Sequence, residues 1–269
     1  MTNDEWLKQA ANTLEKAGTG TARLDCLILL EDELLRDRAW ILAHPERLIL
    51  AEALKKLNKK LARRETHEPL AYIRGFSEFY GRKFKVNKRV LEPRPESETM
   101  IALLKDLQLP TNAVIADVGT GSGALGITAA LELDNYQVDL YDIDASCLAV
   151  ARHNCALHEL HLHCYKRDLL NRSVRPYDVI LANLPYVPNH WKINQAAAME
   201  PRIAIFGGQD GLDLYRRLFE QMKKLSWQSK YILTESLPPQ HQKLAKIAKK
   251  AGYKLHKSQD FIQLFQKLT

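Results

Sequence analysis

The part of the chain after residue 112 alternates short apolar runs with longer amphipathic segments, and this alternation restricts the fold more than any other feature. The apolar runs have the length and composition of buried strands and span residues 113–118, 137–141, 162–165, 177–182 and 230–234. The amphipathic segments have helical periodicity and span residues 124–133, 145–157, 212–224 and 240–251. Strands that alternate with helices of this length are typical of β-α-β units, which form a parallel sheet with helices on both faces.

The last stretch of the chain departs from this alternation. Two strand-like runs, at 253–258 and 261–267, are separated only by the Gln259-Asp260 connection. Two consecutive strands without a helix between them pair antiparallel, so we expect this pair at one edge of the sheet. A parallel core closed by such a pair is the arrangement of Rossmann-like methyltransferases rather than of dehydrogenases. The predicted fold class is therefore α/β.

The first 65 or so residues lack strand-like runs and are predicted to be helical. Apolar residues recur at three- and four-residue steps from Trp6 to Ala17, and further helices are predicted at 22–35 and 46–64. Lys and Arg residues lie between the apolar positions, and a solvated face explains them more simply than a docking surface does. The pattern predicts a small all-α domain ahead of the α/β domain.

The composition changes at His67-Glu68-Pro69, where the helical pattern ends. Residues 79–90 then alternate apolar and basic side chains around Gly81, which predicts a short hairpin. Pro93 and Pro95 follow and fix an extended segment. We therefore expect a helical N-terminal domain at 1–66, a linker with a hairpin and a proline-rich loop at 67–98, and a Rossmann-like domain at 99–269.

Composition and charge exclude several classes of protein. Hydrophobic residues at 46% and charged residues at 26% lie near globular averages. We find no apolar run of the ~20 residues that a membrane helix needs, and no signal peptide. The 4 cysteines lack C-x-x-C spacing, so we predict no metal site and no disulfide framework, and expect a cytoplasmic protein with reduced thiols. The net charge of +7 favours an acidic or phosphate-rich partner only weakly.

A glycine-rich turn is the first candidate binding element. The run Asp117-Val118-Gly119-Thr120-Gly121-Ser122-Gly123 stands where a buried strand ends and a helix begins. Glycines at such a turn let the backbone approach a ligand where a Cβ would clash. The G-x-G-x-G spacing differs from the G-x-G-x-x-G of pyrophosphate sites and suits an uncharged or zwitterionic adenosine ligand better. The predicted cofactor contacts in this turn are Asp117, Gly119, Thr120, Gly121 and Gly123.

Three acidic residues near the ends of the next strands extend this candidate site. Asp142 ends the second predicted strand, where its carboxylate can accept both ribose hydroxyl protons. Asp144 is a neighbouring candidate, but an N-cap of the following helix is the simpler interpretation. Asp168 follows the third strand and is predicted to reach the adenine amine, with a turn or capping aspartate as the alternative.

The candidate catalytic residues are Asn183-Leu184-Pro185-Tyr186, at the end of the fourth strand. Ligands of open α/β sheets bind at this carboxyl edge, although Asn and Pro also commonly end strands. The nitrogen of an amide or exocyclic amine is a poor nucleophile, because its lone pair is delocalised. The Asn183 oxygen and a backbone carbonyl can orient such an NH₂ towards a methyl sulfonium, and the Tyr186 ring can hold the planar group. Orientation then supplies most of the acceleration, without a strong general base.

These motifs together resemble the HemK/PrmC family, the protein-(glutamine-N5) methyltransferases of peptide chain release factors. The glycine turn, Asp142 and the tetrad Asn183-Leu184-Pro185-Tyr186 all match. The other matching segments are Glu68–Gly75 with Glu78–Gly81, the PRPESE loop at Pro93–Glu98, and Glu200–Gly208 with Asp210-Gly211-Leu212. The resemblance implies a class I S-adenosylmethionine-dependent methyltransferase domain behind a helical domain. It implies S-adenosylmethionine as methyl donor, S-adenosylhomocysteine as product, and the glutamine of the release factors' Gly-Gly-Gln loop as acceptor.

The resemblance also implies roles for single residues. Gly119, Gly121, Asp142 and Asp168 would hold the cofactor, with Asn183 also in contact with it. Asn183 and the Leu184 carbonyl would grip the glutamine amide, and Tyr186 would pack against it. The chain's own Gly207-Gly208-Gln209 is interpreted as a turn of the family and not as a substrate motif.

The sequence departs from the family pattern at two places. Leu184 stands where the family usually has proline, but the required group is a backbone carbonyl and Pro185 still restricts the residue before it. The run Thr234-Glu235-Ser236 stands where the family tends to have Glu-Ile-Gly. Asn-Leu-Pro-Tyr is also the form of the tetrad in ribosomal RNA adenine-N6 dimethyltransferases.

Two alternatives therefore stay open: an adenine-N6 methyltransferase acting on RNA or DNA, and a non-enzymatic cofactor-binding module. The segments at 68–98 and 200–212 favour the release factor hypothesis over the first. The intact Asn183, Pro185 and Tyr186 oppose the second. We expect a monomer with release factors as partners, no membrane contact, and no nucleic acid as direct substrate.

Overall fold

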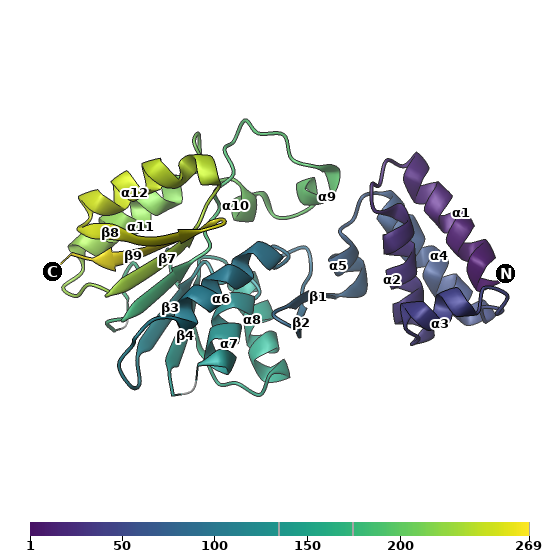
Figure 1. Ribbon diagram of the computed structural model, residues 1–269, viewed down its shortest axis with the longest axis horizontal. Helices are drawn as coiled ribbons and strands as arrows, with labels where there is room; N and C mark the ends of the chain where they lie inside the picture. The colour runs from purple at the N-terminus through teal and green to yellow at the C-terminus, as the bar shows by residue number, and fades with distance from the viewer. Residues whose placement is uncertain (134, 174, 269) are drawn as a thin grey trace. The chain divides into compact units, whose positions relative to one another are not determined.

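The computed structural model describes residues 1–133, 135–173 and 175–268 and divides into two compact units (Figure 1). The first unit consists of Met1–Gly75 together with Ile193–Met199, and the second of Phe76–Lys192 and Glu200–Thr269. No helix within the described ranges has both the length and the apolarity to cross a membrane.

The first unit is helical, as the sequence predicts. Its helices are α1 (Asn3–Lys16), α2 (Ala22–Leu34), α3 (Arg38–Ala43), α4 (Ala51–Glu65), α5 (Leu70–Arg74) and α9 (Gln195–Ala198). A capping box between Thr2 and Glu5 starts α1, and Trp6, Leu14 and Leu57 lie in the buried core. Arg64 and Asp25 form a buried ion pair at 2.7 Å in this unit.

The prediction of one helix from 46 to 64 is wrong at its start, and α3 was not predicted. Residues before Ala51 are held in non-helical backbone by the N-terminal segment: the Asn3 N–H donates to the Arg47 carbonyl, and the Ile49 N–H donates to the Met1 carbonyl. Leu48, which the helical periodicity includes, is largely exposed. A tertiary pairing that the local pattern does not contain has overridden it.

The second unit contains a seven-stranded sheet in the order β5-β4-β3-β6-β7-β9-β8. Its strands are β3 (Val114–Val118), β4 (Gln137–Asp142), β5 (His163–Lys166), β6 (Val179–Ala182), β7 (Tyr231–Glu235), β8 (Tyr253–Gln259) and β9 (Ile262–Lys267). The first five of that order pair parallel, whereas β9 pairs antiparallel with both β7 and β8. The predicted parallel core with an antiparallel edge pair is confirmed.

A separate hairpin, β1 (Phe76–Phe79) with β2 (Arg82–Lys85), precedes the sheet. It begins and ends earlier than the predicted 79–90, because the chain reverses at Tyr80-Gly81. Both turn residues have positive φ, which suits a tight two-residue hairpin turn.

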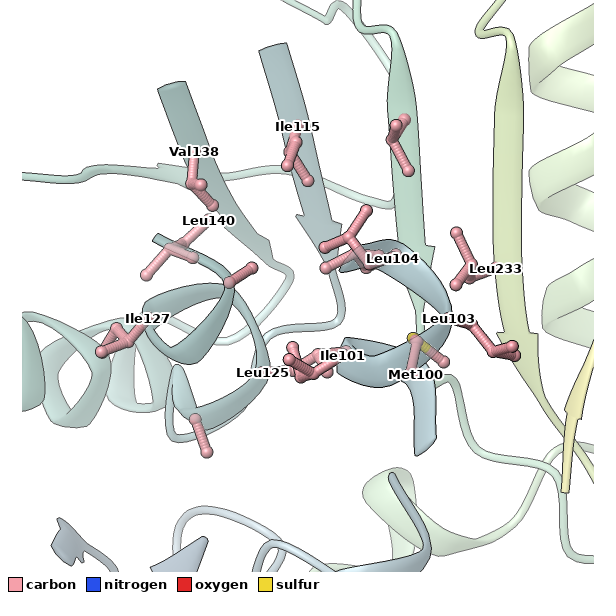
Figure 2. Packing of buried hydrophobic residues seen from close by; sticks show 14 of the residues in the cluster. Met100, Ile101, Leu103, Leu104, Ile115, Leu125, Ile127, Val138, Leu140 and Leu233 are labelled. Atoms are coloured by element: carbon pink, nitrogen blue, oxygen red, sulfur yellow. The ribbon is translucent and has the colours of Figure 1, made fainter. Parts of the chain in front are cut away.

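Helices cover both faces of the sheet (Figure 1). They are α6 (Glu98–Lys105), α7 (Ala124–Glu132), α8 (Ala145–Leu157), α11 (Asp213–Lys224) and α12 (His241–Lys250). The connecting segments of this unit contain the short helix α10 (Arg202–Ile205) and the 3-10 turns η1 (Pro95–Ser97) and η2 (Pro238–Gln240). Figure 2 shows Leu104 of α6 between the strand residues Ile115 and Leu233, and Ile101 beside Leu125 of α7. The opposite face packs against α11 and α12. Two apolar layers thus hold the parallel strands. Because β3, β4, β6 and β7 run in the same direction, their carboxyl ends lie side by side at one end of the sheet.

Candidate active site

The glycine turn after β3 is tied to the end of β4. Gly119, Gly121 and Gly123 all have positive φ, a conformation that favours glycine. The N–H groups of Gly119 and Thr120 each donate to the Tyr141 carbonyl at 2.9 Å. Strand pairing and glycine conformation therefore shape this turn together.

Asp117 holds the turn from the inside. Its side chain is buried, and Oδ2 accepts hydrogen bonds from Thr120 Oγ1 at 2.5 Å and from the Gly126 N–H at 2.9 Å. Burial raises the pKa of Asp117 to about 6, and both hydrogen bonds oppose that rise. The carboxylate thus already serves the loop, and its predicted contact with a cofactor stays a prediction.

Asp142 lies at the end of β4 with both oxygens directed to backbone. Oδ2 accepts from the Gly121 N–H and Oδ1 from the Asp144 N–H, each at 2.9 Å. Burial raises the pKa of Asp142, against these hydrogen bonds. Each oxygen keeps a lone pair for a ligand, because a carboxylate has about four acceptor positions. Asp144 accepts from the Ser146 N–H and caps α8, so the prediction of an N-cap is confirmed.

Asp168 follows β5 and forms an ion pair with Arg217. Its backbone carbonyl accepts from Gln221 Nε2 at 3.3 Å. The ion pair orients the carboxylate, and its predicted contact with an adenine amine remains untested.

These residues border a cavity of about 360 Å³, within the range of small-molecule sites. Its wall combines the glycine turn, the acids, the tetrad and the segment 201–208: the predicted residues among them are Gly119, Gly121, Asp142, Asp168, Asn183, Leu184 and Pro185. A smaller cavity of about 70 Å³ is lined by Asp117, Thr120 and the PRPESE loop. Both cavities share Leu91, Gly119, Gly121 and Asn183, so they adjoin at the tetrad.

Two predicted residues do not line either cavity. Gly123 is the N-cap of α7, where an added Cβ would lie 2.8 Å from Ile127 Cδ1. Tyr186 is half-buried beside β7. Burial beside Glu235 raises the pKa of Tyr186, so the hydroxyl stays protonated and donates to Glu235 Oε1 at 3.0 Å.

Asn183 directs its amide nitrogen towards Ser97 and Glu235. Nδ2 donates to Ser97 Oγ at 2.8 Å and to Glu235 Oε2 at 3.0 Å. The two acceptors lie only 2.5 Å apart, so one N–H group faces both of them. The residues that the structure describes donate no hydrogen bond to Asn183 Oδ1. The side chain therefore offers an acceptor oxygen to the site.

The backbone of Leu184 is fixed by Tyr215 from α11. The Leu184 N–H donates to the Tyr215 hydroxyl at 3.2 Å, and that hydroxyl donates to the Glu235 carbonyl. The Leu184 carbonyl lies 3.4 Å from the same hydroxyl. The side chain of Leu184 fills the space beside Gly119, where an added Cβ would lie 2.9 Å from Leu184 Cδ2.

The backbone oxygens of Pro185 and Tyr186 lie against a second glycine-rich segment. A Cβ on Gly207 would lie 2.2 Å from the Pro185 oxygen, and a Cβ on Gly211 would lie 2.0 Å from the Tyr186 oxygen. Gln240 Nε2 donates to the Tyr186 carbonyl at 2.8 Å. Only glycine fits at these two positions, since the approaching atoms belong to backbone.

The Gly207-Gly208-Gln209 run forms the turn that the sequence predicts. The Gly207 N–H donates to the Val187 carbonyl at 2.9 Å, and Gly208 has a positive φ of 99°. The PRPESE loop is tied to this region by Arg94, which donates to both oxygens of the buried Glu200 at 2.8 Å. Burial raises the pKa of Glu200 to about 7, in spite of Arg94.

Ser97, Glu200, Gly211 and Glu235 lie within segments that were compared with the family pattern, but the sequence predicts no role for them. Tyr215 and Gln240 lie outside all of the motifs. A role for Glu235 could have been predicted, because it follows a predicted central parallel strand. Ligands of open α/β sheets bind at the carboxyl ends of such strands. Within the described ranges, no group of three or more His, Cys, Asp or Glu side chains is placed to hold a metal ion.

Comparisons with known proteins agree on one family. Residues 5–75 match the PrmC N-terminal domain, and residues 98–200 match the methyltransferase small domain. The chain is 37% identical to the release factor glutamine methyltransferase of Koribacter versatilis, over 84% of this chain and 85% of that protein. It is 33% identical to the release factor glutamine methyltransferase of Coxiella burnetii, over 92% of this chain and 89% of that protein.

Solved structures support the fold alone, because their sequence identities are low. A methyltransferase from Pyrococcus furiosus has a TM-score of 0.52 at 17% identity, covering 82% of this chain and 100% of that one. The hMettl16 catalytic domain, in complex with an RNA hairpin, has a TM-score of 0.57 at 12% identity, covering 81% of both chains. Both are similar to this chain in the arrangement of a class I methyltransferase sheet.

The close approach at Gly211 leads to a prediction about stability. Gly211→Ala forces a Cβ into the Tyr186 carbonyl at a positive φ of 80°, so we expect it to lower the free energy of unfolding by more than about 2 kcal/mol. Gly81→Ala is the matched control: its φ is also positive, but the added Cβ meets nothing within 4 Å. That change should cost only about 1 kcal/mol. Urea unfolding of both variants measures the difference, and equal losses would contradict the close approach.

Proposed function

The chain belongs to the family of release factor glutamine methyltransferases, and we propose that it methylates the side-chain amide nitrogen (N5) of the glutamine in the Gly-Gly-Gln loop of peptide chain release factors, with S-adenosylmethionine as donor. The observation that carries the proposal is the fixed amide of Asn183. Its nitrogen donates to Ser97 and Glu235, so its oxygen is left to accept from an incoming NH₂. An amide nitrogen needs such an orientation more than it needs a base.

The cavity has the features that an adenosine-containing donor requires. The backbone at Gly121 is open, since an added Cβ there would meet nothing within 4 Å, and Gly121 lines the cavity. In the proposal, Gly119, Gly121 and Asp142 hold the cofactor, Asp142 through the lone pair that remains on each oxygen. Asp168 takes the exocyclic amine of the adenine. When bound, S-adenosylmethionine supplies an electrophilic methyl group and leaves as S-adenosylhomocysteine.

The tetrad orients the acceptor in this proposal. Asn183 Oδ1 and the Leu184 carbonyl accept the two N–H bonds of the glutamine amide, and the ring of Tyr186 packs on its plane. The nitrogen lone pair, perpendicular to that plane, then faces the methyl group. One N–C bond forms as one S–C bond breaks, and the amide afterwards loses one proton to water. No charged general base is required at the nitrogen.

Further proposals concern the oligomeric state, the partners and the location of the enzyme. We propose that the enzyme acts as a monomer. We propose that the helical residues 1–66 help to dock the release factor, that the enzyme acts in the cytoplasm, and that nucleic acid is not its substrate. The adenine-N6 alternative is not favoured, since relatives similar over most of their length are release factor glutamine methyltransferases.

A labelling experiment tests the proposed function. Purified protein is incubated with methyl-labelled donor and, separately, with intact release factor or ribosomal RNA. We expect label on the tryptic peptide that contains the Gly-Gly-Gln loop and none on RNA. Label on RNA alone would support the adenine-N6 activity, and label on neither would support a binding module.

Asn183→Ala should separate acceptor alignment from donor binding. The variant removes the oxygen that faces the acceptor, so we expect kcat to fall by roughly 100-fold or more. The dissociation constant of the donor, measured by calorimetry, should change by less than about threefold. A parallel loss of donor affinity would show that Asn183 serves the cofactor instead.

Asp142→Ala should have the opposite pattern. Two charge-assisted hydrogen bonds to the ribose would be lost, so the dissociation constant of the donor should rise by roughly 10- to 100-fold. Asp144→Ala is the control, because Asp144 is engaged in capping α8. If Asp144→Ala weakens the donor and Asp142→Ala does not, the assignment of the two residues is reversed.

A further inference from the structure

Three side chains from distant parts of the chain, one of them Asn183 of the tetrad, meet at the carboxyl ends of the strands. Ser97 ends η1, Asn183 follows β6, and Glu235 ends β7. Ser97 Oγ donates to Glu235 Oε2 at 2.5 Å, and Asn183 Nδ2 donates to the same oxygen at 3.0 Å. Ser97 and Glu235 are both buried, with 4% and 1% of their surface exposed. Bulk water therefore does not compete for these contacts.

With Glu235 ionised, the donors and acceptors in this cluster have one arrangement. An ionised carboxylate only accepts hydrogen bonds, so both the Ser97 hydroxyl and the Asn183 NH₂ must donate to Glu235. The Ser97 hydroxyl has one proton, which goes to Glu235, so its oxygen accepts from Asn183 at 2.8 Å. The amide of Asn183 is thereby prevented from turning by 180°, because its oxygen would then face two acceptors.

The second oxygen of the same carboxylate holds another part of the tetrad. Glu235 Oε1 accepts from the Tyr186 hydroxyl at 3.0 Å. Burial raises the pKa of Glu235, and the hydrogen bonds from Ser97, Tyr186 and Asn183 oppose that rise. One carboxylate thus fixes the two tetrad side chains that are expected to meet the acceptor.

We propose that Glu235, together with Ser97, is the positioning pair that determines which end of the Asn183 amide faces the acceptor nitrogen. This inference rests on the proposed function and deepens it, because the oxygen end accepts from an amide NH₂ and the nitrogen end would repel it. In this proposal both residues act through Asn183 and not directly on the acceptor or the donor.

Glu235→Gln tests the proposal most directly. A glutamine at 235 has an NH₂ that can face Asn183, which lets the Asn183 amide turn and present its own NH₂ to the acceptor. We expect kcat to fall by roughly 100-fold, with KM for the release factor and the dissociation constant of the donor within about threefold of the original protein. A kcat within about threefold of the original value, or a parallel loss of donor affinity, would overturn the proposal.

Ser97→Thr and Ser97→Val form a pair that separates the hydroxyl from packing. The two side chains have nearly the same shape, so any strain from the added methyl groups affects both. We expect Ser97→Thr to keep kcat at least about tenfold above that of Ser97→Val, because only threonine can donate to Glu235 and accept from Asn183. Equal values for the two variants would show that the hydroxyl has no positioning role.

Asp139→Asn is the control for loss of a buried carboxylate elsewhere in the sheet. Asp139 lies in β4, is buried, and is paired with Arg175 at 2.9 Å outside both cavities. We expect this variant to lose stability but to keep kcat per folded molecule. A loss of kcat equal to that of Glu235→Gln would indicate a general effect of removing buried charge and would overturn the proposal.

A spectroscopic readout separates this inference from the proposed function. The side-chain NH₂ resonances of Asn183 are assigned by their absence in Asn183→Asp, and their hydrogen exchange is measured in the original protein and in Glu235→Gln. We expect slow exchange in the former and at least about tenfold faster exchange in the latter. Slow exchange without methylation of release factor would leave the positioning intact and refute the proposed substrate. Fast exchange in the original protein would refute the positioning.

Discussion

The site depends on the contact between the backbone of the tetrad and a second, glycine-rich segment. The oxygens of Pro185 and Tyr186 occupy the space where residues 207 and 211 would carry a Cβ. This contact sets the path of the chain after β6, and with it the direction of the carbonyls that precede Tyr186. It also brings the segment 201–208 to the cavity as one of its walls. Other amino acids at the two glycines would move either the tetrad or the wall.

Buried carboxylates at the carboxyl ends of the strands hold two different parts of the site. Asp117 accepts from the Thr120 hydroxyl and from the Gly126 N–H in α7. Asp142 accepts from the Gly121 N–H, and both carboxylates so hold the part of the site assigned to the donor. Glu200 and Glu235 bind loop and tetrad side chains and so hold the part assigned to the acceptor. Asp117, Asp142 and Glu235 each accept from two or more donors, which offsets the cost of taking a charge out of water. The hydrogen bonds of these carboxylates thus fix the orientation of the groups that are expected to meet the donor and the acceptor.

The sequence predicts the α/β unit well, because strand and helix periodicities are local properties. Most predicted strands and helices after residue 112 begin and end within one or two residues of the observed elements. The prediction from sequence is wrong where a contact joins distant segments. Residues 46–50 have helical periodicity, but their hydrogen bonds to the N-terminal residues hold them in non-helical backbone. The roles of Ser97 and Glu235 are hidden for the same reason, since 138 residues separate them. Positions at the sheet edge were predictable, but their hydrogen-bond partners were not.

Leucine at position 184 gains a contact that proline cannot make. The Leu184 N–H donates to the Tyr215 hydroxyl, and proline has no N–H to give. The same hydroxyl donates to the Glu235 carbonyl, so one tyrosine links the tetrad to the end of β7. Proline would fix φ at residue 184 through its ring, whereas leucine here is held by a hydrogen bond and by Pro185 after it. Because the chain is restrained on both sides, the carbonyl of residue 184 keeps a defined direction without the second proline.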